Sequence, residues 1–243
     1  MGVAIRAAGE DDRELVVRLL DESFRDDPVS SWVFPDAEYR RRTHHRLMGA
    51  FTDVVLADGR IDLTEDGAAC ALWLSMPASD DAHGSADPAG SADPAGSADP
   101  SGPAGPGGPD GPAGPGGRGG EPADPAVWMR ETVDPANPRV EEIVRLLDAT
   151  HPVGRAHEYL WMVAVAPDRQ GAGLGGALVR HVLDRCDREG LPAYLEASSP
   201  RSTRLYERLG FAYTGTTVDL PDGPRMWPMW REPGTGAWTA EKR

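Results

Sequence analysis

Cysteine is scarce in this chain, and long hydrophobic runs are absent. Cys70 and Cys186 are its two cysteines in 243 residues, and each lies in an apolar pattern with no CxxC pair. We therefore expect no disulfide framework and assign no metal site. No apolar run reaches 18 residues, and the opening stretch MGVAIRAAGEDDRELV lacks the apolar core of a signal peptide. These absences predict a cytoplasmic protein with buried, unreactive thiols.

Positive charge is also in short supply. The chain has 25 Lys and Arg residues against 39 Asp and Glu residues, for a net charge of −14. Nucleic acids and anionic membranes require a basic face, so we expect neither as a partner. A negative surface is instead compatible with a cationic amine as the substrate.

Residues 83–122 differ abruptly in composition from the rest of the chain. The hexapeptide GSADPA repeats from Gly84 and then gives way to PAGPGGPDGPAGPGG. This segment has no aromatic or aliphatic anchor with which to offset its ordering entropy, which predicts a disordered insertion. We expect one domain over residues 1–233, interrupted by this insertion, and a flexible tail over residues 234–243.

The most informative stretch is Tyr159–Gly176, with the sequence YLWMVAVAPDRQGAGLGG. Its apolar first half predicts a buried strand, and the apolar residues after its glycines recur at intervals of four, which predicts a helix. A strand, a glycine turn and a helix together point free backbone N–H groups at an anion. The stretch therefore predicts a phosphate or pyrophosphate cradle.

Two cofactor classes use such a cradle. Gly171, Gly173 and Gly176 spell G-x-G-x-x-G, the dinucleotide fingerprint, and Glu196 lies where an acidic ribose ligand would follow. The stretch beginning one residue earlier reads Q-x-x-G-x-G, the coenzyme A pyrophosphate loop of the GNAT acetyltransferases. A dinucleotide fold needs several further βα units, and about 70 residues follow Gly176. Acyl-CoA binding is therefore favoured over dinucleotide binding or a tight turn without a ligand.

The rest of the chain predicts alternating strands and helices. Asp11 with Glu14 is typical of a helix start, Asn137-Pro138 is another, and Glu65-Asp66-Gly67 is typical of a hairpin turn. His44 and His45 are adjacent and cannot share a helix face, so we expect solvated or partly packed side chains. We predict strands over 3–6, 60–64, 68–76, 160–166, 193–197, 211–220 and 225–231, helices over 11–26, 39–55, 137–150, 174–189 and 199–209, and only weak order over 126–132.

The chain resembles the GNAT superfamily in the stretches VAVAPDRQGAGLGGALV and YLEASSPRSTRLYERLGF. Its ending, LPDGPRMWPMWREP, is similar to the puromycin N-acetyltransferase type. The resemblance implies an α+β fold, a mixed and mostly antiparallel sheet of six or seven strands flanked by helices. It implies acetyl-CoA as co-substrate, held in a splay between two central parallel strands, and it is compatible with a homodimer.

The resemblance also assigns roles to residues. Tyr206 matches the tyrosine that protonates the departing thiolate, and its unperturbed pKa near 10 suits that donation. Ser199 stands where the superfamily often has asparagine, and a serine can still bond cofactor amides. The expected cofactor-binding residues are the pantetheine-pairing backbone of Val163, Ala164 and Val165, the pyrophosphate-binding N–H groups of Gln170, Gly171, Ala172, Gly173, Leu174 and Gly175, and Ser199.

An amine must lose a proton before or during its attack on a thioester. The candidate bases are Glu158 and Glu196, each acting directly or through water, with His157 as a weaker candidate. We therefore expect an acetyl-CoA-dependent N-acetyltransferase that acts on a primary amine of a small molecule, such as an antibiotic, by direct transfer in a ternary complex. The alternatives are a protein lysine or N-terminal acetyltransferase, a non-catalytic acyl-CoA sensor, and a nicotinamide-dependent oxidoreductase.

Overall fold

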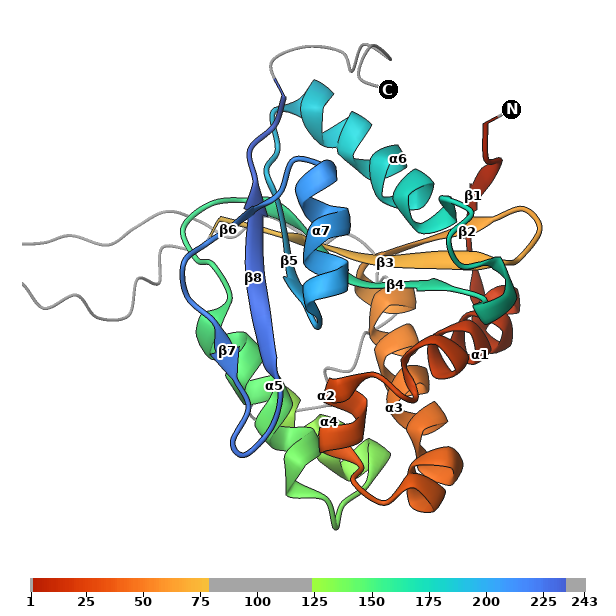
Figure 1. The fold of residues 1–243 in the computed structure, drawn as a ribbon, viewed down its shortest axis with the longest axis vertical. Helices are drawn as coiled ribbons and strands as arrows, with labels where there is room; N and C mark the ends of the chain where they lie inside the picture. The colour runs from red at the N-terminus through yellow and green to blue at the C-terminus, as the bar shows by residue number, and fades with distance from the viewer. Residues whose placement is uncertain (1, 79–123, 235–243) are drawn as a thin grey trace, which may run out of the picture.

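The computed structural model describes residues 2–78 and 124–234 (Figure 1). The predicted insertion at 83–122 and all but the first residue of the predicted tail lie outside the described residues. None of the described helices is both long and apolar enough to cross a membrane.

One mixed sheet forms the centre of the fold. Its strand order is β1-β2-β3-β4-β5-β8-β6, and β7 also pairs with β8. Every pair is antiparallel except β4 with β5, which confirms the mixed, mostly antiparallel prediction and excludes a doubly wound dinucleotide fold. The sheet counts eight strands rather than six or seven. They are β1 Ile5–Ala7, β2 Arg60–Thr64, β3 Ala69–Met76, β4 His157–Val165, β5 Ala193–Ala197, β6 Ala212–Tyr213, β7 Val218–Asp219 and β8 Arg225–Arg231.

The two parallel strands separate soon after they meet. Glu158 pairs with Ala193 and Tyr159 with Tyr194, and no further pairs follow. On its other edge β4 stays paired with β3, but the register skips Trp161, which is the extra residue of a β-bulge. A bulge bends its strand and increases the local twist. Beyond Tyr159, the edge of β4 that faces β5 therefore has no strand partner, and the sheet opens there.

Helices cover both faces of the sheet (Figure 1). Along β3, Cys70 and Leu72 belong to the core shared with α1, α3 and α5, while Ala71 and Trp73 belong to the core shared with α6. This alternation is the period of two that a sheet buried on both faces requires. Both cysteines are buried, as predicted. The helices are α1 Arg13–Phe24, α2 Pro28–Val33, α3 Ala37–Asp58, α4 Pro125–Val133, α5 Pro138–Thr150, α6 Leu174–Glu189 and α7 Pro200–Arg208, with 3-10 turns at Glu10–Asp12 and Pro167–Arg169.

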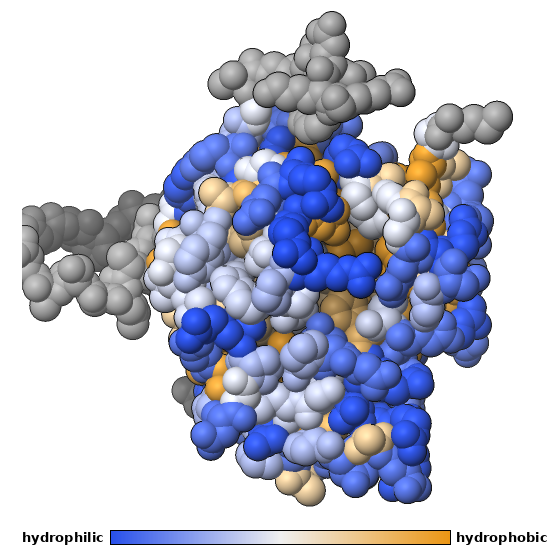
Figure 2. Space-filling view, viewed as in Figure 1, coloured by the Kyte–Doolittle hydropathy of each residue, from blue (hydrophilic) through white to orange (hydrophobic). Residues whose placement is uncertain are grey.

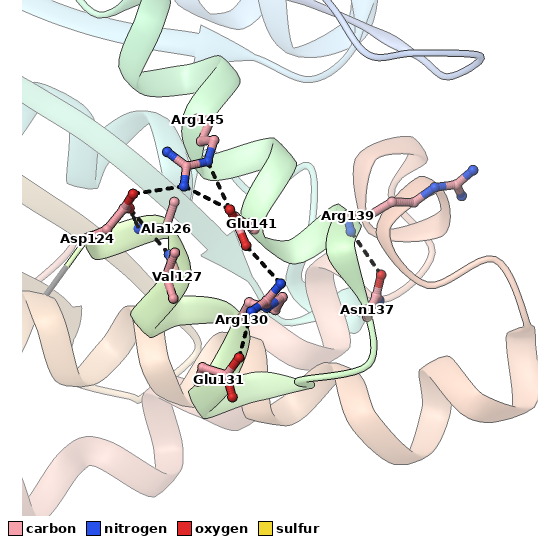
Figure 3. A network of polar contacts seen from close by, with 9 residues as sticks. All are labelled: Asp124, Ala126, Val127, Arg130, Glu131, Asn137, Arg139, Glu141 and Arg145. Carbon is pink, nitrogen blue, oxygen red and sulfur yellow. Dashed lines mark hydrogen bonds and ion pairs between the residues drawn. The ribbon is translucent and has the colours of Figure 1, made fainter.

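Helices α4 and α5 are joined by a polar network (Figure 3). Asp124 caps α4 through the N–H groups of its first turn and accepts a bond from Arg145 Nη2 at 2.8 Å. Glu141 accepts from Arg145 and also lies 3.1 Å from Arg130 Nη1. Asn137 caps α5, as predicted. Caps of this kind contribute about 1 kcal/mol each, whereas exposed ion pairs contribute roughly 0–1 kcal/mol.

Helix α1 ends at Phe24, near its predicted end. A further helix, α2, was not predicted and starts at Pro28, with Asp27 as its side-chain cap. Two local predictions were wrong. The predicted strand over 211–220 is broken into β6 and β7, because Gly215 between them takes a left-handed φ of 96°. Helix α1 starts at Arg13, and its N-cap residue Asp12 makes no side-chain cap bond because its carboxylate pairs with Arg6.

Candidate active site

A pocket of about 600 Å³ opens where β4 and β5 separate. One wall consists of β4, the loop before α6, the end of β5 and α7. The facing wall consists of α1, the start of α2, α3 and α5. Figure 2 shows a hollow whose floor is hydrophobic and whose rim is hydrophilic. In the same view in Figure 1, α7 lies above this hollow, and α1 and α2 lie below it.

The loop before α6 has the geometry of an anion cradle. Gly171 and Gly173 both have a left-handed φ of 82°, and a Cβ on either would meet open space. The first bond of α6 runs from Ala177 N–H to Gly173 C=O, so the N–H groups of Leu174 and Gly175 have no intrahelical partner. The positive end of the helix dipole lies at the same point. These features fit a pyrophosphate, as the sequence predicted.

Close packing against β4 fixes the position of the cradle. A Cβ on Gly175 would lie 3.4 Å from Val165 Cγ2 and 3.6 Å from Val163 Cγ2, so glycine allows the helix to approach the strand. Gln170 is exposed, and its Nε2 donates to Val165 O at 3.4 Å. The pocket is lined by most of the predicted cofactor residues, namely Val163, Val165, Gln170, Gly171, Gly173, Leu174, Gly175 and Ser199, but not by Ala164 or Ala172.

Glu196 lies at the point where the strands part. Tyr159 Oη donates to Glu196 Oε2 at 2.7 Å. Burial raises the pKa of Glu196 to about 7, against the opposing effects of hydrogen bonds from Tyr159 and Tyr194. A carboxyl group with this pKa is half ionised near neutral pH, which suits a general base.

Tyr206 lines the same pocket from α7. Its ring packs edge-on against Phe211, with centroids 6.0 Å apart. Burial raises the pKa of the Tyr206 hydroxyl, and the nearby Asp27 carboxylate raises it further. The phenol therefore stays protonated at neutral pH and is able to donate.

Ser199 has a local structural partner. Its Oγ accepts from Ser202 N at 3.2 Å, and Ser202 Oγ lies 3.0 Å away, so the two serines cap α7. The side chain lines the pocket while serving as the cap. Contact of Ser199 with the cofactor stays a prediction.

Glu158 and His157 do not line the pocket. Glu158 is 3% exposed, pairs with Arg185 of α6 at 3.0 Å and accepts from Ser75 Oγ. His157 Nε2 lies 3.0 Å from His151 Nε2, and its Nδ1 lies 2.7 Å from Arg155 O. Because adjacent strand residues point to opposite faces, Tyr159 reaches Glu196 while Glu158 faces α6. The structure thus brings together Glu196 and Tyr206 and separates Glu158 from them.

Sequence reasoning missed the facing wall. His44, expected to be solvated or partly packed, is fully buried and hydrogen-bonded to Asp21 and Ser30. Asp27 and Ser30 of the α2 segment line the pocket. The signal for α2 was present, since Asp27-Pro28 is the same cap-plus-proline pattern that identified the start of α5. No group of three or more potential metal ligands lies together in the described parts of the chain.

The comparisons with known proteins agree with this geometry. Residues 140–211 match the model of the acetyltransferase (GNAT) family. An uncharacterized N-acetyltransferase of Schizosaccharomyces pombe is 38% identical over 80 residues, 32% of this chain and 32% of its own. Mycothiol acetyltransferase of Kineococcus radiotolerans is 43% identical over 70 residues, 27% of this chain and 22% of its own. The chain thus covers a third or less of these relatives.

The fold likeness extends much further than the sequence likeness. A crystal structure described as histone acetyltransferase HPA2 and related acetyltransferase, from Corynebacterium glutamicum, superimposes with a TM-score of 0.61. The match covers 97% of this chain and 99% of that one at 22% identity. The chain thus has the α+β fold of GNAT acetyltransferases, and one segment of it matches the model of that family.

Proposed function

We propose that this protein transfers the acetyl group of acetyl-CoA to a primary amine of a small molecule. The observation that carries the proposal is that one pocket is lined by Glu196, Tyr206 and the glycine cradle. The partly buried Glu196 carboxyl, whose pKa is raised to about 7 by burial, can take a proton from a bound ammonium near neutral pH.

The residues of the pocket fit acetyl-CoA. The N–H groups at the start of α6 would hold the pyrophosphate, and the free edge of β4 would pair with the amides of the pantetheine arm. Arg201 and Arg208 of α7 also line the pocket and add positive charge for the phosphates. Acetyl-CoA supplies the acetyl thioester, and residues of this chain supply the proton acceptor and the proton donor.

We propose direct transfer within a ternary complex. Glu196 takes a proton from the bound ammonium, and the neutral amine attacks the acetyl carbonyl, so that an N–C bond forms while the C–S bond breaks. Tyr206 donates its proton to the departing thiolate, and the second proton that the nitrogen loses as the amide forms restores the Tyr206 hydroxyl. Holding both reactants in one pocket replaces a bimolecular encounter by a local one. No cysteine lines the pocket, so the proposal contains no acyl-cysteine intermediate.

The shape of the facing wall favours a small acceptor with an apolar body. Phe51 of the facing wall packs against Trp161 of β4 with centroids 4.5 Å apart, and both line the pocket. Leu47, Met48 and Ile143 extend the same apolar surface. The resemblance of the chain's ending to the puromycin N-acetyltransferase type makes puromycin, an aromatic amine, the first compound to assay.

The test has two stages. The first is thermal melting with acetyl-CoA, CoA and NAD in parallel, in which only a ligand that binds the folded state raises the midpoint. The second is the release of CoA in the presence of puromycin, phenylalkylamines, a lysine peptide and a peptide with a free N-terminal alanine. We expect a rise with acetyl-CoA but not with NAD, and turnover with small amines.

The other outcomes would each replace the proposal. Turnover of the peptides alone would make the protein a peptide acetyltransferase. A rise with acetyl-CoA and no turnover of any amine would make it an acyl-CoA sensor. A rise with NAD alone would make Glu196 a ribose ligand.

A further inference from the structure

The facing wall of the pocket contains a buried hydrogen-bond chain that the proposed chemistry does not use. His44 of α3 has no exposed surface, and its Nδ1 lies 2.7 Å from Asp21 Oδ1 while its Nε2 lies 2.9 Å from Ser30 Oγ. Ser30 is 6% exposed and lines the pocket. Residues from α1, α2 and α3 are thus joined behind the pocket surface.

The neighbours of this chain determine where its protons lie. Asp21 also pairs with Arg25, and this ion pair with the hydrogen bonds from Arg25 and His44 outweighs burial, so the pKa of Asp21 is lowered. Burial lowers the pKa of His44, so the imidazole is neutral. An ionised carboxylate can only accept, so His44 Nδ1 carries the proton and Nε2 accepts from Ser30. The Ser30 hydroxyl proton therefore points away from the pocket.

Other hydroxyl groups around the pocket are oriented in the same way. Ser23 Oγ donates to Val165 O at 3.1 Å, and Ser198 Oγ donates to Asp27 Oδ2 at 2.8 Å. Asp27, one helical turn before Ser30, presents a carboxylate that also accepts from Val29 N. Burial raises the pKa of Asp27, against the hydrogen bonds from Ser198 and the start of α2. With Asp27 ionised, each of these groups offers a ligand lone pairs only. These serine and aspartate side chains can therefore accept hydrogen bonds from a ligand but donate none to it.

We propose that Ser30 and Asp27 form a second recognition point that binds a hydrogen-bond donor on the body of the amine substrate. This inference rests on the proposed function and narrows its substrate class. The acceptor would be a small hydrophobic amine with a second donor group, such as a hydroxyl, an amide N–H or a second ammonium. A site built to bond a donor rejects an analogue that lacks it, because the buried acceptors are then left unpaired. Asp21 and His44 act as positioning residues, since they hold the Ser30 hydroxyl in its orientation.

Matched pairs of amines test this selectivity. Tyramine and 4-methoxyphenethylamine, like serotonin and 5-methoxytryptamine, differ in one respect: a hydroxyl donor is replaced by a methoxy acceptor. Values of kcat and KM are measured for each compound by CoA release. For the wild-type protein we expect kcat/KM to favour the hydroxyl member of at least one pair by about 10-fold or more, mainly through KM.

Two variants connect this preference to the proposed residues. Ser30→Ala should reduce the ratio within the pair to about 1 while leaving the pH profile of kcat unchanged. Asp27→Asn keeps the size of the side chain but introduces an N–H donor, and should shift the preference toward the methoxy member. Ser75→Ala is the matched control, because Ser75 bonds Glu158 outside the pocket, and it should retain the wild-type ratio. Melting with acetyl-CoA verifies that each variant is folded.

Several results of these measurements would refute the second recognition point. Equal rates for both members of each pair in the wild type, or a preference that survives both Ser30→Ala and Asp27→Asn, would overturn it while leaving the acetyltransferase proposal intact. Failure of every amine to react, although acetyl-CoA raises the melting midpoint, would refute the proposed function and this inference with it. If Ser30→Ala does not fold, the Asp27→Asn result decides alone.

Discussion

The wall of the pocket formed by the edge of β4 and the loop before α6 offers main-chain groups to a ligand, whereas the wall formed by α1, α2, α3 and α5 offers side chains. The first wall depends on two left-handed glycines and on a strand edge without a partner. The second depends on residues such as Phe51 of α3 and Asp27 and Ser30 of the α2 segment. Main-chain recognition suits a ligand that stays the same throughout a superfamily, while side-chain recognition is able to change with the acceptor.

Glu196 and Tyr206 lie where these two walls meet, and substitution of Glu196 should have the largest effect. We expect Glu196→Gln to lower kcat by about 10²- to 10⁴-fold, because the amine loses its proton acceptor. In the wild type kcat should fall as the pH drops below about 7, where Glu196 becomes protonated. A steady-state pH profile of both proteins measures this. Glu158→Gln is the control: a larger loss of kcat there than in Glu196→Gln would transfer the role of base to Glu158.

Although Glu196→Gln should lower activity, it should raise the free energy of unfolding above neutral pH. Folding raises the pKa of Glu196 to about 7 from its ordinary value of 4.5, so between these values the folded state binds more protons than the unfolded state. Stability therefore falls as the pH rises through this window. Glu196→Gln removes that decline and should raise the free energy of unfolding at pH 8 relative to wild type by roughly 1–3 kcal/mol. Urea unfolding at pH 5 and pH 8 tests it, and an equal pH dependence in both proteins would contradict the assignment.

Tyr206→Phe should have the next largest effect. Loss of the proton donor should lower kcat by about 10²-fold with little change in the affinity for acetyl-CoA, since the ring and its contact with Phe211 are kept. Presteady-state release of CoA separates chemistry from product release. Tyr39→Phe is the control, because the Tyr39 hydroxyl bonds Asp134 outside the pocket. Similar losses in the two variants would point to a general effect of removing a hydroxyl group.

The two walls also differ in how far the sequence predicts them. The cradle was predictable because its requirements are local: glycines at fixed intervals, a strand before them and a helix after them. Glu196 and Tyr206 lie in a second stretch, YLEASSPRSTRLYERLGF, and the role of Tyr206 followed from the resemblance of that stretch to the superfamily. The orientation of Glu158 was not predictable, because an error of one residue in the register reverses the face of every side chain. Likewise the buried chain from Asp21 through His44 to Ser30 depends on how three helices pack, which no local pattern specifies.

Glycine substitutions at the two ends of α6 test whether the first wall acts through its main chain. Gly173 and Gly190 have left-handed φ values of 82° and 70°, and a Cβ on either meets open space. Alanine at either position should cost about 1 kcal/mol of stability. Only Gly173→Ala should also weaken acetyl-CoA binding, by about 10-fold, because the added methyl group lies where the pyrophosphate approaches. Calorimetric titration measures both variants, and equal affinities would show that the cradle does not contact the cofactor.

The smallest effect is expected when the contact by which α5 holds α2 in place is removed. Arg139 of α5 donates to the carbonyl of Trp32 at 2.7 Å and its guanidinium lies 4.9 Å from the centre of the Trp32 ring, so it fixes the end of the helix that carries Ser30. Arg139→Ala should lower stability by about 1 kcal/mol and raise the KM for the amine a few-fold, with acetyl-CoA affinity unchanged. Arg145→Ala is the matched control within the same polar network (Figure 3), because its ion pairs are exposed and remote from α2. If both variants shift the amine KM equally, the effect comes from the α4–α5 pair as a whole; a shift confined to Arg139→Ala would mean that the acceptor wall depends on how α2 is held.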